Sequence, residues 1–353
     1  MMRSTPFRYR APRSVAEVTS ILDGEGPDAV LLAGGTDLIP NLKRRQLRPK
    51  TLVSLSRVAD LMRVDAERLG AGVRLSDLAA VSALDPARRP GLRGLQLAAR
   101  SVASPLIRNV GTVGGNLCVD TRCNYYNQTP EWRRAIDFCK KAPGPAGVAV
   151  EDRNPSTCWV APSSPRCWAV SSTDLAPALS ALGARVVLRS RSQAREIDVQ
   201  DLFADDGMAF LTKARDELIT EIRLPALEGD WRSTWWKIRR RGSIDFAVLS
   251  VAAALRFDGE AVVEGRLVLG AVASRPVPVP LDDVIGGPLD DEVLELIAGQ
   301  AARSATPLDN TDFTMSWRRQ IVSGVVKNAL RELRGDPVSS FAPGRCAGPA
   351  LVV

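Results

Sequence analysis

Apolar residues in the first part of the chain alternate between helical and strand-like spacing. A capping box at 14–17 precedes apolar residues at helical intervals, which predicts a short helix over residues 14–24. The continuous apolar run 29–32 predicts a buried strand, and a polar helix and a second strand are predicted at 41–46 and 51–55. This order of elements predicts a small α/β unit at the N-terminus.

Helices and strands continue through the middle of the chain. Helical spacing occurs at 76–84, 94–102 and 174–182, and strand-like apolar runs occur at 184–188 and 218–224. The last third changes to long apolar stretches. Here the Asp-Gly dipeptide at 258–259 separates two strands and predicts a β-hairpin, with strands at 247–257 and 262–273. Two helices, 290–302 and 316–333, are expected to close this domain.

Length and composition set the class of protein. At 353 residues the chain exceeds the size at which one hydrophobic core keeps growing, so two or three domains are expected. Apolar residues make up 45% and charged residues 25%, as in ordinary globular proteins. No apolar run reaches the roughly 18 residues that cross a bilayer. The N-terminus lacks an apolar signal core, so we expect a cytoplasmic protein without membrane contact.

The charged residues and the missing histidine exclude several functions. The net charge is +7, and basic runs such as 43–45 and 239–241 lack interleaved aromatic residues. This pattern favours solvated or partner-docking charge over contact with nucleic acid. Because the chain has no histidine, Ser-His-Asp and Cys-His nucleophile systems and HExxH zinc sites are excluded. Any metal must be bound by thiolates or carboxylates, and a cofactor is expected to supply the chemistry.

Two glycine-rich turns follow apolar sequence. The first glycine segment, residues 33–37, reads Ala-Gly-Gly-Thr-Asp, and the second glycine segment, residues 111–116, reads Gly-Thr-Val-Gly-Gly-Asn. Amide groups unshielded by side chains suit a phosphate or pyrophosphate. Neither turn has the GxGxxG pattern of a nicotinamide-binding fold. Two such turns favour a dinucleotide, and plain turns without a ligand are the alternative.

Five of the six cysteines lie within fifty residues, in a stretch rich in Pro, Gly, Asn and Ser, which we call the cysteine segment (118–168). A segment this long without periodicity is expected to be functional. Its last four cysteines are separated by 16, 19 and 9 residues. Disulfides fit small secreted domains, zinc sites usually show paired CxxC spacings, and iron–sulfur clusters tolerate wide spacing. The spacing favours iron–sulfur, with zinc and structural thiols as alternatives. Cys118 and Cys346 are not expected to be ligands.

With these segments in view, the chain closely resembles the FAD-binding medium subunits of the molybdenum hydroxylase (xanthine dehydrogenase) family. The resemblance covers nearly the whole chain. It rests on stretches at 33–38, 107–117, 172–177, 237–246 and 270–276 and on a C-terminal helix with Trp317 and Arg318. It implies an α+β fold, with a two-part FAD-binding domain of the vanillyl-alcohol-oxidase (PCMH) type and a C-terminal α/β domain like that of CO dehydrogenase flavoproteins. We therefore place the two parts of the FAD-binding domain at 1–56 and 57–226. The C-terminal domain is placed at 227–335, and an irregular tail at 336–353.

The resemblance also implies which residues bind FAD. Those expected around the pyrophosphate are Leu31, Leu32, Ala33, Gly34, Gly35, Thr36 and Asp37. Those expected near the flavin and its ribityl chain are Thr112, Val113, Gly114, Gly115 and Asn116. Asp174 and Lys237 are expected to add polar contacts, although a surface lysine beside an arginine run is an alternative reading of Lys237.

The cysteine segment itself resembles the β subunit of 4-hydroxybenzoyl-CoA reductase, in which an inserted loop carries a 4Fe-4S cluster. The likeness lies at the start and the end of the segment. It implies that the cluster ligands are Cys123, Cys139, Cys158 and Cys167. The interval from Cys139 to Cys158 is longer here, and Trp159 stands where that branch has histidine.

The resemblance implies an oxidoreductase subunit that transfers electrons through FAD and the 4Fe-4S cluster and carries no catalytic residue for the organic substrate. The implied partners are a large molybdopterin subunit and a small subunit with two 2Fe-2S clusters, assembled as a dimer of heterotrimers. The implied reaction is reductive removal of an aromatic hydroxyl from a CoA thioester. The alternative is hydroxylation of an aromatic or N-heterocyclic compound. From the residues alone, a basic, zinc-stapled nucleic-acid-binding protein is the alternative from another class.

Overall fold

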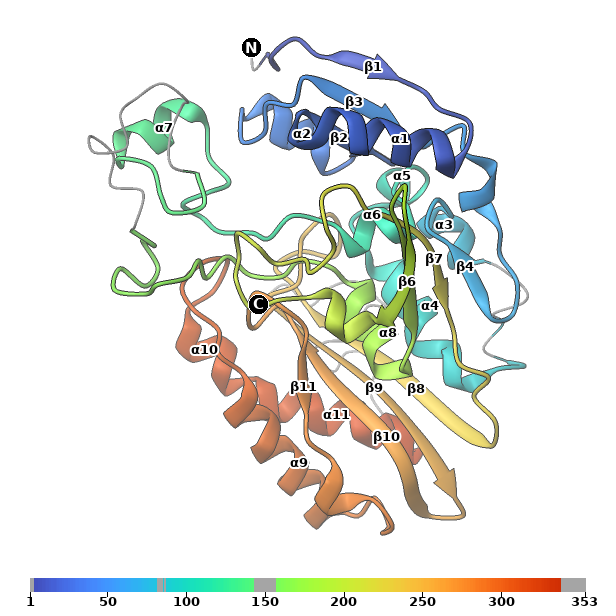
Figure 1. Cartoon of the computed structure of the whole chain (residues 1–353). Helices are drawn as coiled ribbons and strands as arrows, with labels where there is room; N and C mark the ends of the chain where they lie inside the picture. Colours follow the sequence, from blue (N-terminus) through green and yellow to red (C-terminus); the bar gives the residue numbers. More distant parts are fainter. Residues whose placement is uncertain (1–2, 81–84, 86, 143–156, 338–353) are drawn as a thin grey trace.

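Three sheets organise the chain in the computed structural model, which describes residues 3–80, 85, 87–142 and 157–337 (Figure 1). The end of the predicted helix 76–84, the middle of the cysteine segment (143–156) and the tail 338–353 with Cys346 lie outside the described residues. Figure 1 shows the N-terminal sheet at the top, the second sheet below it and the C-terminal sheet at the bottom.

The N-terminal unit is a parallel sheet in the order β1-β3-β2. Its strands are β1 (Arg8–Arg10), β2 (Ala29–Leu32) and β3 (Thr51–Ser54). Helix α1 (Val15–Glu25) begins at the predicted capping box, where the Ser14 hydroxyl accepts from the Glu17 amide at 3.2 Å. Helix α2 (Leu38–Lys43) begins earlier than predicted, directly after the first glycine segment. The predicted α/β unit is therefore present, with β1 as an additional strand.

The second sheet is antiparallel, in the order β4-β7-β5-β6. Its strands are β4 (Arg68–Gly70), β5 (Arg185–Arg189), β6 (Ala194–Asp198) and β7 (Leu218–Arg223). The helices around it are α3 (Leu75–Leu78), α4 (Arg93–Ser101), α5 (Pro105–Arg108), α6 (Val113–Leu117) and α8 (Leu175–Leu182). Every residue of α8 is buried, because this helix lies between the second sheet and the C-terminal sheet.

The C-terminal sheet is antiparallel, in the order β11-β10-β9-β8. Its strands are β8 (Asp230–Ile238), β9 (Leu249–Asp258), β10 (Ala261–Gly270) and β11 (Val277–Val279). The β9–β10 hairpin turns at the predicted Asp-Gly pair, so that prediction is confirmed. The closing helices are α9 (Asp291–Ser304), α10 (Met315–Gln320) and α11 (Val322–Arg334). The single helix predicted at 316–333 is therefore two helices, which meet at Ile321.

Strand β9 is buried on both faces, which explains its continuous apolar sequence. Val251, Ala253 and Leu255 belong to the core that the sheet forms with α9 and α11. Ala252 and Ala254 face the opposite way, into the core that contains α4 and α8. Because successive strand residues point to opposite faces, small alanines on one side let α8 pack closely against the sheet.

The cysteine segment continues from helix α6 and forms a separate lobe around α7 (Pro130–Ala135), shown at the left of Figure 1. Side-chain to backbone hydrogen bonds attach it to two parts of the molecule. Gln46 donates to the Tyr126 carbonyl at 2.7 Å, and Asn310 donates to the Trp168 carbonyl at 2.6 Å. The lobe is thus held between the N-terminal unit and the C-terminal domain. None of the helices in the described part of the chain combines the length and apolar character that a bilayer crossing needs.

Arg318 provides a test of the packing between α10 and the C-terminal sheet. Its buried guanidinium donates to the carbonyls of Val248, at 2.9 Å, Leu308, at 2.8 Å, and Ala271. We expect Arg318→Met to lower the free energy of unfolding by about 3 kcal/mol or more, because each buried carbonyl left unpaired costs about 1–3 kcal/mol. Urea unfolding followed by tryptophan fluorescence measures the change. The control is Arg319→Met, an exposed neighbour expected to change stability by less than about 0.5 kcal/mol. Equal stability of the two variants would contradict this account.

Candidate functional site

The first glycine segment follows β2 and leads into α2. Within the described part of the chain, the amide groups of Gly34, Gly35 and Thr36 donate to no other protein group, and all three residues are half-buried. Gly35 has a φ of +72°, a conformation that favours glycine. Because amides away from bulk water are normally paired, this run of unpaired donors fits phosphate oxygens.

The second glycine segment differs from what its sequence suggested. It enters helix α6, and its amides are already paired: Val113 donates to the Val73 carbonyl at 2.9 Å, and Gly114 donates to the Ala71 carbonyl at 2.8 Å. The Gly115 amide donates to the Thr112 hydroxyl at 3.1 Å. The prediction of a second turn with free amides is therefore wrong. The amides of this segment are not available to bind a phosphate, and its small residues allow close approach of the backbone.

The two glycine segments are in backbone contact, although 76 positions separate Gly34 from Val110. A Cβ added at Gly34 would lie 2.2 Å from the Val110 carbonyl oxygen and 2.9 Å from the Gly111 Cα. A Cβ at Gly115 would lie 3.6 Å from the Ala33 side chain. Figure 1 shows the same relation, with α5 and α6 directly beneath the N-terminal sheet. The free amides of the first segment thus border a surface made by the second.

Two polar side chains of the glycine segments are already committed to the protein. The Asp37 carboxylate accepts from the Arg122 guanidinium, from the Asn41 side chain at 3.1 Å and from the Asp120 amide at 3.2 Å. The Asn116 side-chain oxygen accepts from the Thr173 hydroxyl at 2.8 Å and from the first amide of α8 at 3.0 Å. Both side chains therefore orient the segments that carry them. Their contact with a cofactor stays a prediction.

Asp174 and Lys237 form a buried ion pair. The Lys237 ammonium, with a fully buried side chain, donates to the Asp174 carboxylate at 2.7 Å and to the Ser101 carbonyl at 3.1 Å. Burial raises the pKa of Asp174 above its ordinary value. The alternative of a surface lysine is thus wrong. The pair joins the start of α8 to β8, and any polar contact to a cofactor stays a prediction.

Four of the cysteines come together although three intervals of sequence separate them. Cys123, Cys139 and Cys167 belong to one buried group with Tyr126, Ala142 and Ala169, and the buried Cys158 shares a hydrogen bond with Cys167. Cys118 lies apart, packed against the large central core. The structure therefore gathers the four cysteines that the sequence singled out and separates the fifth.

Burial disfavours the charged thiolate form of two of these cysteines. It raises the pKa of Cys123 to about 11 and raises that of Cys139. In the Cys158–Cys167 pair, the shared hydrogen bond holds the pKa of Cys158 below its ordinary value and that of Cys167 above it. Binding of a metal group here would release these protons. Among the described residues, no group of three or more Cys, Asp or Glu side chains is arranged to hold a metal ion.

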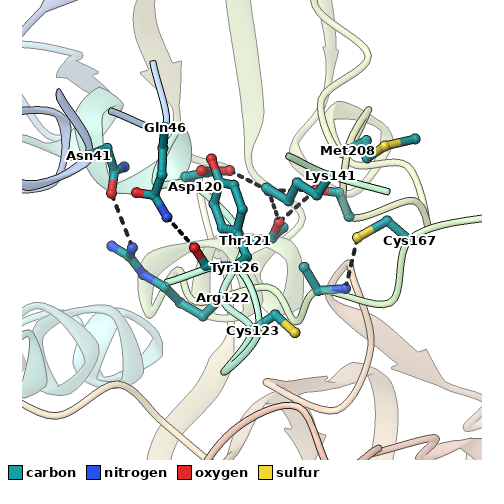
Figure 2. A network of polar contacts seen from close by, with 12 residues as sticks. Asn41, Gln46, Asp120, Thr121, Arg122, Cys123, Tyr126, Lys141, Cys167 and Met208 are labelled. Atoms are coloured by element: carbon teal, nitrogen blue, oxygen red, sulfur yellow. Dashed lines mark hydrogen bonds and ion pairs between the residues drawn. The ribbon is translucent and has the colours of Figure 1, made fainter. Parts of the chain in front are cut away.

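Lys141 and its neighbours were not identified as site residues from the sequence. Figure 2 shows the Lys141 ammonium directed at Asp120 and Thr121, beside Tyr126 and close to Cys167. It donates to the Asp120 carboxylate at 2.6 Å. The signal that the sequence offers is the lysine pair that directly follows Cys139. Its partners are too distant in sequence for any spacing rule to detect.

The free amides of the first glycine segment, which lie against the second glycine segment, fit a protein that binds a nucleotide cofactor. Two families match. The FAD binding domain in molybdopterin dehydrogenase matches residues 5–227, and the CO dehydrogenase flavoprotein C-terminal domain matches residues 234–333. The chain therefore belongs to the FAD-binding medium subunits of the molybdenum hydroxylase family and is an oxidoreductase subunit. This confirms the family and the fold class that the sequence predicted. The exact domain boundaries stay a prediction.

Three similar proteins support this placement. The aldehyde oxidoreductase FAD-binding subunit PaoB of Escherichia coli is 31% identical over 76% of this chain and 82% of its own length. The nicotine 6-hydroxylase medium subunit of Paenarthrobacter nicotinovorans is 24% identical over 94% of this chain and 98% of its own. The structure of reconstituted CO dehydrogenase from Oligotropha carboxidovorans superposes with a TM-score of 0.74 at 22% identity, covering 95% of this chain and 100% of that one.

The contact at Gly34 predicts a specific effect on cofactor binding. In Gly34→Ala, the new methyl group would overlap the Val110 carbonyl, so the two glycine segments must separate. Such overpacking costs about 1–3 kcal/mol, which corresponds to about 5- to 150-fold weaker FAD binding. Titration of the apoprotein with FAD measures it. Gly24→Ala is the control, because a Cβ there meets nothing within 4 Å. Unchanged FAD affinity in Gly34→Ala would remove this segment from the cofactor site.

Proposed function

We propose that this chain is the FAD- and 4Fe-4S-carrying electron-transfer subunit of a molybdenum-dependent hydroxylase or reductase complex. The observation that carries the proposal is the gathering of four buried cysteine thiols in a chain that belongs to a FAD-binding family. Flavin and iron–sulfur groups on one polypeptide form a pathway for electrons between partner subunits.

FAD would be held by the two glycine segments. The amides of Gly34, Gly35 and Thr36 would bind the pyrophosphate oxygens, and residues 112–116 would border the flavin. Bound FAD supplies two-electron chemistry, which it can also carry out in single steps. The protein fixes the position of the cofactor and needs no histidine for this task, in agreement with the absence of that residue.

The sequence spacing favours an iron–sulfur cluster over a single zinc ion, because zinc sites usually show paired CxxC spacings and iron–sulfur clusters tolerate wide ones. Among the described residues no group of three or more Cys, Asp or Glu side chains is arranged to hold a metal ion, so the thiols would have to rearrange around either group. The wide sequence spacing and the burial of Cys123, Cys139, Cys158 and Cys167 support the same choice. The cluster passes single electrons.

The partners are proposed from the kind of complex in which related chains occur. Related chains bear the names medium subunit and FAD-binding subunit. We therefore expect a large subunit with molybdopterin and a small subunit with two 2Fe-2S clusters, in a dimer of heterotrimers. The resemblance of the cysteine segment supports reductive dehydroxylation of an aromatic CoA thioester. The relative named nicotine 6-hydroxylase supports the second candidate, hydroxylation of an N-heterocyclic compound.

Replacement of one cysteine tests the cluster. We expect the native protein to hold one FAD and about four iron per chain, with brown colour that bleaches on reduction. Cys139→Ser should lose most of the iron and keep its FAD, because Cys139 belongs to the thiol group and to neither glycine segment. Metal analysis and visible spectra measure both. Cys118→Ser, outside the thiol group, should keep its iron. Zinc in place of iron in the native protein, or unchanged iron in Cys139→Ser, would contradict the ligand assignment.

Isolation of the native complex tests the partners. An affinity tag on this chain in its own host should recover two further subunits, with molybdenum in a ratio of one to one with FAD. The purified complex can then be assayed with reduced viologen and an aromatic CoA thioester, and separately with N-heterocycles and an electron acceptor. Recovery of the chain alone, with flavin and without molybdenum, would refute the proposed complex.

A further inference from the structure

Lys141 is a largely buried cation beside the thiol group. Its side chain is only 7% exposed, and it follows Cys139 by two residues. Its ammonium donates to the Asp120 carboxylate at 2.6 Å, to the Gly207 carbonyl at 2.7 Å and to the Thr121 hydroxyl. Burying a charge is unfavourable unless it is fully hydrogen-bonded, so three acceptors around one ammonium indicate a defined position.

The three acceptors come from two chain segments, one that leads into Cys123 and one that is hydrogen-bonded to Cys167. Asp120 and Thr121 lie just before Cys123. Gly207 donates its amide to the Cys167 carbonyl at 2.9 Å, and a Cβ at this glycine would lie 2.9 Å from the Cys167 sulfur. Lys141 itself belongs to the tight turn in which the Ala142 amide donates to the Cys139 carbonyl at 2.9 Å. One ammonium therefore connects the segments of three of the four cysteines.

The surroundings of the ammonium also affect the thiol group electrostatically. The ring centroids of Tyr126 and Phe210 lie 4.7 and 5.4 Å from the Lys141 nitrogen. Because the lysine side chain is largely buried, its charge acts over longer distances than it would in water. Figure 2 shows Lys141 lying between the Asp120–Thr121 segment and Cys167.

We propose that Lys141 is the positioning residue of the four-cysteine site: its ammonium holds the chain segments next to Cys123, Cys139 and Cys167 together, and its charge stabilises the anionic, thiolate-bound group. This inference rests on the proposed function, because it takes the bound group to be that cluster. Groups that orient metal ligands from outside the coordination shell are worth about 10- to 100-fold in metal affinity.

The test compares Lys141→Met with a matched control in the full-length protein carrying FAD. Methionine keeps the unbranched stem and removes the charge and the three hydrogen bonds. We expect iron release to a chelator to become roughly tenfold or more faster and the cluster's reduction potential to become more negative, because a nearby positive charge is lost. The FAD content should stay unchanged. Lys50→Met, which removes an exposed ion pair of 2.8 Å to Asp28, should behave like the native protein.

A second variant keeps the test decisive if Lys141→Met folds poorly. The fully buried Thr121 accepts from Lys141 and donates to the Gly207 carbonyl at 2.6 Å. Thr121→Val keeps the volume and the Asp120 ion pair, so a smaller acceleration of iron release in the same direction is expected. If Lys141→Met releases iron at the rate of the native protein and has an unchanged reduction potential, the proposed role of Lys141 is overturned while the proposed cluster is not. A native protein that takes up no iron would overturn the cluster and this inference together.

Discussion

The carboxylate of Asp37 connects the two candidate sites of this chain. It closes the first glycine segment, and it accepts hydrogen bonds from the Asp120 amide and from Arg122, the residue before Cys123. The Arg122 guanidinium also packs 4.5 Å from the ring centre of Phe246 in the C-terminal domain. Removing one partner of such a largely buried pair leaves the other charge uncompensated, which is strongly unfavourable. The spacing between the glycine segments and the thiols is thereby fixed, as the proposed electron transfer between two bound groups requires.

Helix α8 is a second element that is held in a fixed position. It is buried between two sheets, and the residues at its start are bonded to neighbouring parts of the molecule. The Asn116 side chain caps it from the second glycine segment, and the Asp174–Lys237 pair joins it to β8. The second glycine segment and the C-terminal sheet therefore meet at one end of α8. A rigid junction at this point means that the C-terminal domain supports the proposed flavin environment, although it contributes none of the glycine segments.

The sequence predicted what depends on local rules. The α1 cap at Ser14 and the β9–β10 hairpin at Asp258–Gly259 follow from side-chain and turn chemistry within a few residues, and both are present. Strand β8 was not predicted, because Trp235 and Trp236 are buried on opposite faces and the strand shows no alternation of polar and apolar residues. The free amides of one glycine segment and the paired amides of the other could not be distinguished either. That difference depends on the carbonyls of Ala71 and Val73, which only the fold brings close.

The chain accommodates a long, irregular cysteine segment because the backbone on its two sides is joined by hydrogen bonds. Its ends are joined by a two-way backbone pair, in which the Arg122 amide donates to the Val170 carbonyl at 2.8 Å and the Val170 amide donates to the Arg122 carbonyl at 2.7 Å. When the ends of a loop are fixed side by side, its length changes the entropy of closure only slowly. The segment can therefore vary in length without disturbing α8 or the second sheet. Cys123 and Cys167 lie just inside this closure, so half of the thiol group is positioned by the domain itself and the remaining two thiols need internal connections such as those of Lys141.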